Sequence, residues 1–234
     1  MDLTGPTPDQ TRRLITLNRA LMTQHLLRGI AHDLRNNLQV VALGASLGDD
    51  AGGISVSVRV DRALDEMTAA LDLLSRLGRT AANEPAETDV GEALSEAVHL
   101  AALQRNLPTL GLTIEPPPAP AAVRMPRSEL VQVVLNLVAN AKDSGPLATD
   151  PVTVGVSAPM DGEVALTVVD RGSGIPPSAG APFASTKDPA NHAGLGLFVV
   201  RALVEGRGGR LVCDRLPEGG TRIRVVLPAA GCPA

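Results

Sequence analysis

A histidine, an acid and an amide lie close together near the start of the chain. In the stretch GIAHDLRNNLQ, residues 29–39, His32 precedes Asp33, and Asn36 follows one helical turn later. A neutral imidazole nitrogen is a nucleophile near neutral pH, and an adjacent carboxylate stabilises the positive charge that develops on the ring. A solvated helix face with a chance histidine is the alternative interpretation of this stretch taken alone.

A second stretch, LVQVVLNLVANAKDSG at 130–145, carries amides at steps of four. Gln132, Asn136 and Asn140 fall opposite the apolar face of this predicted helix, because residues four apart are neighbours on a helix. Asparagine has a mediocre helix propensity, so a pair on one side indicates a task for side-chain oxygens. Such oxygens suit Mg²⁺, which keeps several waters and binds nucleotide phosphates with few protein contacts. A solvated stripe explains the pattern equally well.

Two stretches with paired glycines follow. In VALTVVDRGSGIPP an apolar strand ends in Asp170, followed by Gly172 and Gly174. A carboxylate there can accept a hydrogen bond from an exocyclic amine, and the glycines let a planar base approach the backbone, which suits adenine. In AGLGLFVV, Gly194 and Gly196 precede an apolar helix whose free N–H groups favour phosphate. An ordinary turn and an ordinary helix start are the alternatives.

The two commonest nucleotide-binding motifs are absent. No GxxxxGK[ST] sequence exists, and Val199 stands where the dinucleotide motif needs its last glycine.

The histidine requires a helix to present it. Thr7 and Pro8 predict a helix start. Apolar residues then recur at spacings of three and four, as in a buried stripe: Leu14, Leu17, Leu21, Leu27, Ile30, Leu34, Leu38 and Val41. His32 is two positions from Ile30 and Leu34, which rotates it by roughly 200° around the helix. We therefore expect His32 to face solvent.

A second helix is predicted over about 55–82, so that residues 1–83 form a helical hairpin. Two hairpins can bury their apolar stripes by closing into a four-helix bundle, which predicts a homodimer. The polar, proline-containing stretch at 84–88 is typical of a linker.

Beyond the linker, residues 89–234 predict a mixed α/β domain. Helices are expected at 90–106, 127–143 and 195–205, and strands at 109–115, 152–157, 164–169, 210–213 and 221–227. The fold class is α+β, a helical hairpin followed by an α/β sandwich.

Composition excludes several classes of function. The net charge of -4 and the 1% aromatic content give no support for nucleic-acid binding. No apolar stretch approaches the roughly 20 residues that span a bilayer, and the amino terminus lacks the apolar core of a signal peptide. Two cysteines make no disulfide framework. We expect a cytoplasmic protein that binds no nucleic acid and no membrane.

In this order and spacing, the motifs resemble those of a known family. AHDLRNNL, NLVANAKDS, DRGSGIP, PFASTK and AGLGL are similar to the H, N, G1, F and G2 boxes of sensor histidine kinases, over about residues 10–228. The family pairs a dimeric helical hairpin with an ATP-binding sandwich of the gyrase, heat-shock chaperone, kinase and MutL type. The resemblance implies phosphorylation of a histidine by ATP and Mg²⁺, then transfer to an aspartate of a response-regulator receiver domain.

The resemblance also implies roles for individual residues. His32 would be the phosphoacceptor, Asp33 its adjacent acid, and Asn36 the residue that positions a water for dephosphorylating the partner. Asn140 would be the Mg²⁺ ligand. The remaining nucleotide-binding positions are Asn136 near the phosphates, Asp143 in the N box, Asp170 as adenine reader with Gly172 and Gly174, Lys187, Gly194 and Gly196 over the phosphates, and Thr221 supporting adenine through water.

The chain departs from the family pattern in places. Asn37 replaces a common proline, His192 stands where the first G2 glycine often lies, and 175–193 is a short lid. A histidine phosphotransferase with a vestigial ATP-binding domain, relaying phosphoryl groups between receivers, is the main alternative. A nucleotide-gated binding module is another. No sensor segment is present, so we expect the signal to come from a separate sensor protein or from a larger system to which this chain belongs.

Overall fold

A computed structural model describes residues 5–47, 58, 60–65, 67–68, 84–102, 111–115, 117–144, 151–174 and 194–231. The elements in chain order are α1 (Pro8–Leu47), β1 (Thr88–Asp89), α3 (Val90–Ala102), β2 (Leu112–Glu115), β3 (Ala122–Val123), α4 (Arg127–Ser144), β4 (Val152–Val156), β5 (Glu163–Asp170), α5 (Gly196–Glu205), β6 (Arg210–Arg215) and β7 (Thr221–Pro228). Residues 60–65 are also helical.

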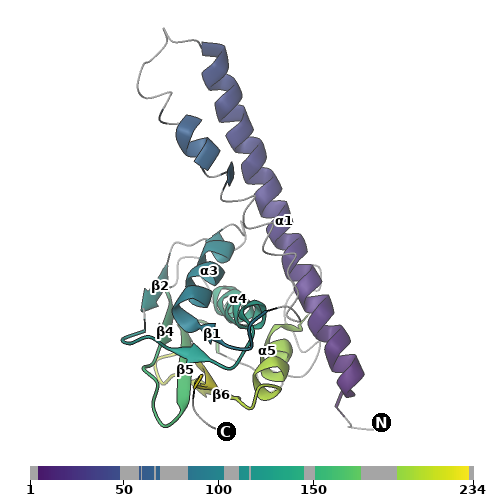
Figure 1. The fold of residues 1–234 in the computed structure, drawn as a ribbon, viewed down its shortest axis with the longest axis vertical. Helices are drawn as coiled ribbons and strands as arrows, with labels where there is room; N and C mark the ends of the chain where they lie inside the picture. Colours follow the sequence, from purple (N-terminus) through teal and green to yellow (C-terminus); the bar gives the residue numbers. More distant parts are fainter. Residues whose placement is uncertain are drawn as a thin grey trace.

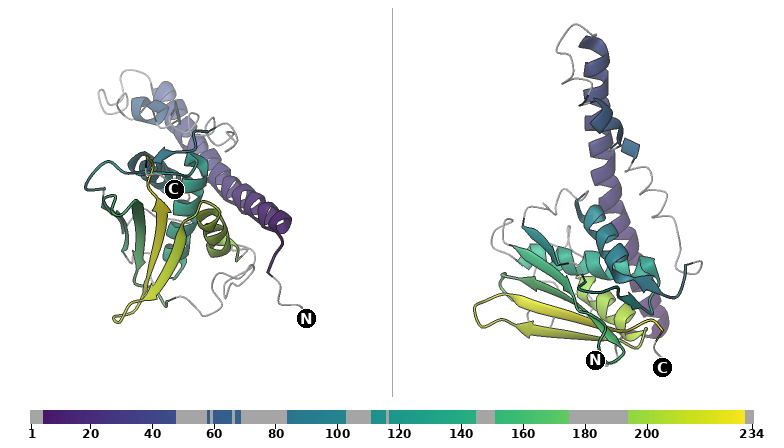
Figure 2. Two further views of the ribbon diagram at one scale, coloured as in Figure 1. Left: turned by 60° about the horizontal axis from the view of Figure 1, so that its bottom comes forward. Right: turned by 60° about the vertical axis from the view of Figure 1, so that its left-hand side comes forward.

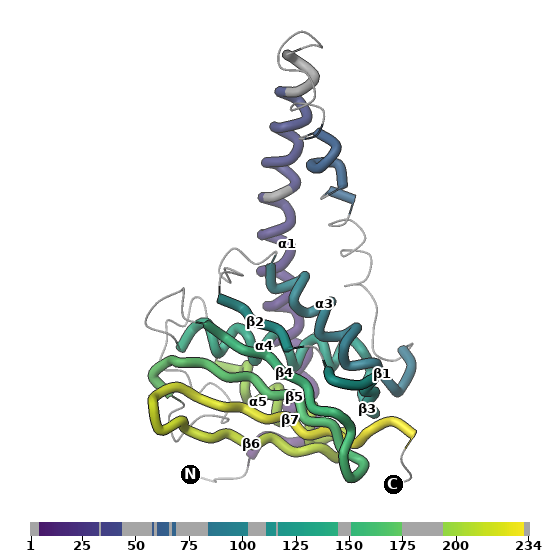
Figure 3. Tube along the Cα trace, turned by 90° about the vertical axis from the view of Figure 1, so that its left-hand side faces the viewer, coloured from purple at the N-terminus to yellow at the C-terminus, as the bar shows by residue number. Residues whose placement is uncertain are grey.

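Five strands form one sheet in the order β2-β4-β5-β7-β6 (Figure 3). All neighbours are antiparallel except β2 and β4, which are parallel. Burial alternates along β5, where Val164, Leu166, Val168 and Asp170 are buried. This alternation is typical of a sheet with one face on the core and one in water.

The covered face of the sheet carries the helices α3, α4 and α5 (Figure 2). Aliphatic side chains from both layers make one core, which includes Leu137 and Val133 of α4 at 0% exposure. A second, short ribbon joins β1 to β3, and Thr88 Oγ1 donates a hydrogen bond of 2.6 Å to the Met125 carbonyl.

The long helix α1 lies outside the helix layer, so α4 and α5 have the sheet on one side and α1 on the other. Leu26 and Ile30 of α1 are each 1% exposed and belong to the same core as the sheet. The second half of α1 extends past the domain (Figure 1). The amino-terminal half of α1 is therefore part of the α/β layer structure.

Some residues of the predicted apolar stripe of α1 are buried against the α/β domain, and others are exposed to solvent. Ile30 is buried against the α/β domain, whereas Leu17, Leu27 and Leu38 are 46%, 45% and 55% exposed in the single chain. An extra position that the stripe did not include, Asn18, is 7% exposed. Asn18, Met22 and Leu26 follow steps of four along the helix and all pack toward the α/β domain, so this face of α1 is the contact face.

The mixed sheet with covering helices confirms the predicted fold class. The predicted helices and strands from residue 109 onward agree with the observed bounds to within three residues wherever the structure describes both. The pair β1 and β3 was not predicted, and Thr88, placed in the linker, belongs to it. The division at 1–83, 84–88 and 89–234 and the homodimer stay predictions.

Candidate nucleotide-binding site

The carboxylate of Asp170 is held at the end of β5 by the end of α4. Its Oδ1 accepts a hydrogen bond from the Gly172 amide at 2.8 Å and lies 3.0 Å from Ser144 Oγ. The Ser173 amide donates to the Ser144 carbonyl at 3.0 Å. A Cβ placed on Gly172 would lie 2.4 Å from that carbonyl oxygen, so only glycine permits this approach. The second carboxylate oxygen, Oδ2, has no hydrogen-bond partner among the described residues.

Thr221 lies directly opposite Asp170 on the neighbouring strand β7. It is 1% exposed, and its hydroxyl is buried with no hydrogen-bond partner in the described part of the chain. Gly220, at φ 93°, brings the chain against the Asp170 carbonyl, where a Cβ would lie 2.0 Å from the oxygen. A buried hydroxyl without a partner needs a ligand or a water, and this one adjoins the predicted adenine reader.

The N and G2 motifs meet at the start of α5. A Cβ on Gly196 would lie 3.1 Å from Asn136 Oδ1 and 3.2 Å from Asn140 Oδ1. Asn140 is half-buried, and its amide makes no hydrogen bond to another described residue. The first turn of α5 therefore presents its free backbone N–H groups beside the amide that the sequence singles out for Mg²⁺. A single free amide oxygen suits an ion held mainly by phosphates and water.

Asn136 is 4% exposed and is hydrogen-bonded to α1, which the sequence analysis did not foresee. Its amide pairs reciprocally with Asn18: Asn18 Nδ2 donates to Asn136 Oδ1 at 3.0 Å, and Asn136 Nδ2 donates to Asn18 Oδ1 at 3.1 Å. Gln132 Nε2 donates to the same Asn18 oxygen at 2.8 Å. Gln132 and Asn136 are thus not a solvated stripe, and their polar face is buried against one asparagine of α1.

His32 is half-buried on α1, with Asn36 exposed beside it. The Asn36 side-chain nitrogen lies 3.1 Å from His32 Nδ1. The oxygen and nitrogen of an amide are assigned from hydrogen bonding, so Asn36 can accept from Nδ1–H or donate to a bare Nδ1. When it accepts, the neutral ring carries its proton on Nδ1 and its lone pair on Nε2.

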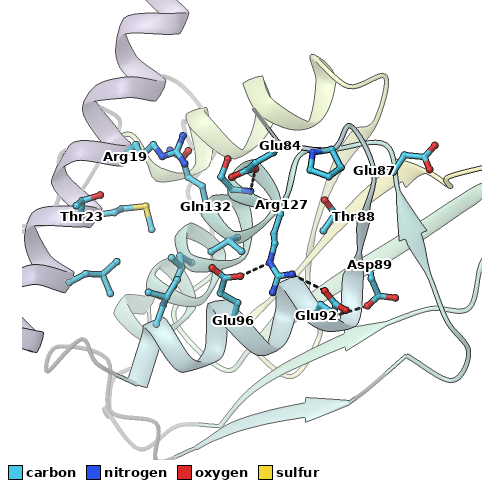
Figure 4. A pocket seen from close by; sticks show the side chains of 17 residues that line it. Arg19, Thr23, Glu84, Glu87, Thr88, Asp89, Glu92, Glu96, Arg127 and Gln132 are labelled. Carbon is cyan, nitrogen blue, oxygen red and sulfur yellow. Dashed lines mark hydrogen bonds and ion pairs between the residues drawn. The ribbon is translucent and has the colours of Figure 1, made fainter. Parts of the chain in front are cut away.

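A cavity of about 540 Å³ separates α1 from α3 and α4 (Figure 4). Its walls include Met22 and Leu26 of α1 and Gln132 of α4, but neither Asp170 nor Asn140. Arg127 crosses it with hydrogen bonds to Glu96 at 2.5 Å and Glu92 at 2.7 Å (Figure 4). Burial acts to lower the pKa of Arg127, but the bonds to the two carboxylates outweigh it and raise the pKa. The cavity is distinct from the site around Asp170.

The remaining predicted site residues are placed as follows. Gly174 and Gly194 both adopt positive φ, at 87° and 64°, beside the site. Asp143 is half-buried one residue before Ser144. Lys187, His192 and the Asp33 side chain lie outside the described residues. Within the described ranges no group of three or more His, Cys, Asp or Glu is gathered for a metal ion, and no helix is long and apolar enough to cross a membrane.

Comparison with known proteins agrees with this geometry. Residues 126–231 match the family described as histidine kinase-, DNA gyrase B-, and HSP90-like ATPase. The sensor histidine kinase ZraS of Klebsiella oxytoca is 29% identical over 217 residues, which cover 88% of this chain and 46% of that protein. The histidine protein kinase DivJ of Caulobacter vibrioides is 34% identical over 152 residues, which cover 62% of this chain and 25% of that protein.

Solved structures show the same fold. The mycobacterial sensor histidine kinase MprB superposes with a TM-score of 0.53 at 26% identity, covering 61% of this chain and 96% of that one. Full-length ShkA in complex with AMPPNP covers 98% of this chain and 47% of its own, with a TM-score of 0.52 at 22% identity.

Fold, site and family match together define residues 126–231 as an ATP-binding domain of the ATPase family that includes histidine kinases, DNA gyrase B and HSP90. Over most of its length the chain is similar to the catalytic core of sensor histidine kinases. It spans less than half the length of the curated relatives named above.

Proposed function

We propose that this chain binds ATP with Mg²⁺, transfers the γ-phosphoryl group to His32, and passes it to an aspartate of a response-regulator receiver domain. The proposal rests on three polar groups of the site that have no hydrogen-bond partner among the described residues. They are Oδ2 of Asp170, the buried hydroxyl of Thr221 and the side-chain amide of Asn140. A nucleotide offers an exocyclic amine to the first and an ion-bound phosphate to the last.

The phosphate end of the proposed site is the junction of Asn140 with the start of α5. Mg²⁺ there would neutralise charge on the transferring phosphoryl group, with Asn140 as its protein ligand. The α5 amino terminus, Gly194 and Lys187 would hold the remaining phosphate oxygens. Asn136 and Asp143 complete the N box in this proposal.

At the acceptor, Asn36 would hold the imidazole with its proton on Nδ1. Nε2 would attack the γ-phosphorus, and the bond from that phosphorus to the ADP oxygen would break. The proton on Nδ1 would then pass to Asp33 once the hydrogen bond to Asn36 is released. Asn36 would serve a second purpose by placing a water for dephosphorylation of the receiver aspartate. For Asn36→Ala we expect autophosphorylation to remain and receiver dephosphorylation to fall; equal loss of both activities would contradict a separate phosphatase role.

The observed packing of α1 bears on how transfer occurs. Asn18 touches Asn136, and His32 lies 14 residues further along α1, which is about 21 Å at 1.5 Å per residue. His32 of the same chain is thus out of reach of a phosphate held at Asn140 while Asn18 stays in place. We propose that phosphoryl transfer follows release of α1 or uses His32 of a second copy in a homodimer.

The proposed function is tested with γ-labelled ATP, Mg²⁺ and the full chain. We expect acid-labile, alkali-stable label that His32→Gln abolishes and that His25→Gln, on the same helix, retains. Label that persists in His32→Gln would place the acceptor elsewhere. Mixing His32→Gln with Asp170→Asn restores label only if one chain phosphorylates another.

The alternatives predict different results in the same assays. A phosphotransferase with a vestigial ATP domain would bind no ATP, yet would take label from a phosphorylated receiver. A nucleotide-gated module would bind ATP and acquire no label. The cytoplasmic location and the separate sensor protein also belong to this proposal, and the exposed leucines of α1 support the homodimer.

A further inference from the structure

Three residues on adjacent strands form a row at one end of the sheet. Asp170 of β5 is paired with Thr221 of β7, and Thr221 is paired with Arg215 of β6. Residues directly opposite in antiparallel strands lie on the same face of a sheet. Asp170 and Thr221 are buried on the covered face, so Arg215 starts from that same face, two strands away from the carboxylate.

The Arg215 side chain reaches back across the row to the loop that follows Asp170. A Cβ placed on Gly174 would lie 3.5 Å from Arg215 Nε and 3.7 Å from its Cζ. The guanidinium therefore packs on the second glycine of the G1 motif, at the rim of the candidate base pocket. No sequence motif pointed to this position.

Arg215 lacks the acidic partner that three nearby arginines have. Arg207 pairs with Glu129, Arg210 with Glu163 and Arg224 with Asp214. Among the described residues, Arg215 makes no ion pair and no side-chain hydrogen bond. Its five N–H donors are available for a ligand.

At the Asp170 end the row offers a hydrogen-bond acceptor, and at the Arg215 end it offers donors. Asp170 offers a carboxylate oxygen to the exocyclic amine of adenine, whose neighbouring ring nitrogen, N1, is an acceptor. The Thr221 hydroxyl between them can serve either role through a water. Guanine presents an oxygen and an N–H at the same two positions, so a paired acceptor and donor would select adenine.

We propose that Arg215 is a base-recognition residue, which donates from its guanidinium to N1 of adenine, directly or through one water beside Thr221. This inference rests on the proposed nucleotide site and adds a residue that determines its specificity. The planar, permanently charged guanidinium suits the edge of a base better than a lysine ammonium does.

The test compares Arg215→Met with Arg222→Met in the full chain, using ATP, 1-deaza-ATP and GTP in direct binding measurements. Arg222 is exposed on β7, one position along from Thr221 and so on the opposite face, and has no partner among the described residues. A hydrogen bond from a charged donor at an exposed position is expected to be worth about tenfold in affinity. We expect Arg215→Met to weaken ATP about tenfold and Arg222→Met to change it less than twofold.

The deaza analogue distinguishes a hydrogen bond from Arg215 to N1 from an effect of Arg215 on the packing of the loop that contains Gly174. If Arg215 donates to N1, wild type loses affinity for 1-deaza-ATP, and Arg215→Met shows little further loss, because both changes remove one interaction. Additive losses, or an Arg215→Met variant that binds ATP as wild type does, would overturn the inference. ATP binding by the wild-type chain is measured first. If the wild-type chain does not bind ATP, the proposed function is wrong, and this result is distinct from a failure of the Arg215 inference.

Discussion

Two long helices, α4 and α1, both carry polar side chains four residues apart, Gln132 and Asn136 in α4 and His32 and Asn36 in α1, yet the surroundings of the two pairs are opposite. In α4 both faces are covered, the aliphatic one by the sheet and the Gln132 and Asn136 face by α1. The second half of α1 extends beyond the domain, and Leu38 in this half is 55% exposed. A spacing of four between polar side chains therefore does not by itself distinguish a buried face from an exposed one.

The two polar faces differ in their hydrogen-bond partners. The amides of α4 meet Asn18, whose one oxygen accepts from both of them, so their burial leaves no donor without a partner. The hydrogen bond between His32 and Asn36, one turn away, stays within α1. A contact between two helices fixes a domain in place, whereas a contact within one helix only orients the ring.

The largest expected effect is the difference in stability between removing a buried leucine of α4 and removing an exposed leucine of α1. Leu137→Ala, at 0% exposure in α4, should lower the free energy of unfolding by about 2–5 kcal/mol, because it leaves a cavity in the core. Leu38→Ala, at 55% exposure in α1, should change it by about 0.5 kcal/mol or less in the isolated chain. Urea unfolding measures both. A loss for Leu38→Ala that depends on protein concentration would show that a second copy covers this face.

A smaller effect is expected at the contact between the helices. Asn18→Ala leaves the Gln132 and Asn136 amides buried without their shared acceptor, which should cost about 1–3 kcal/mol. Gln24→Ala, on an exposed position of α1, is the matched control and should stay within about 0.5 kcal/mol. Equal effects of the two variants would mean that α1 does not rest on α4 in solution.

Much of the fold was predictable because its signals are local. The apolar runs of β5, α3, α4 and α5 identify their elements without reference to the rest of the chain. The two-residue strands β1 and β3 have no such run, because each pairs over two residues only. Their pairing depends on distant residues, which a local pattern does not record.

The motif residues of the site were predictable, whereas their contacts with one another and with α1 were not. Asp170 and its glycines stand out in sequence, and Thr221 was named through the family resemblance. The contacts of Ser144 with Asp170 and of Asn18 with Asn136 are made by the fold. One signal for Asn18 was present, since it interrupts a step-of-four series with Leu14, Met22 and Leu26. A polar residue inside an apolar stripe indicates a buried polar partner, although it does not identify which one.

A modest effect is expected where charges bridge α4 and α3. Arg127→Met removes the bonds to Glu96 and Glu92 from a side chain that is 35% exposed, so we expect a loss of about 0.5–1 kcal/mol. The loss should shrink in 1 M salt, since screening weakens such pairs in wild type. Leu137→Ala should keep its full effect under the same conditions. A salt-independent loss at Arg127 would assign its role to packing of the aliphatic stem along the cavity wall.

The smallest effect is expected at the sheet edge, where Glu163 and Arg210 pair in water. The hydrogen bond from Arg210 holds the pKa of the Glu163 carboxyl below its ordinary value of 4.5. A lowered folded-state pKa means that the pair's contribution is present above the unfolded pKa and is lost as the pH falls through the folded one. Glu163→Gln should therefore be slightly less stable than wild type at pH 7, and the two should converge as the pH falls through the lowered pKa of the folded state. Urea midpoints over a descending series of pH values measure this convergence. A difference that stayed unchanged over the whole series would exclude the carboxylate charge as its source.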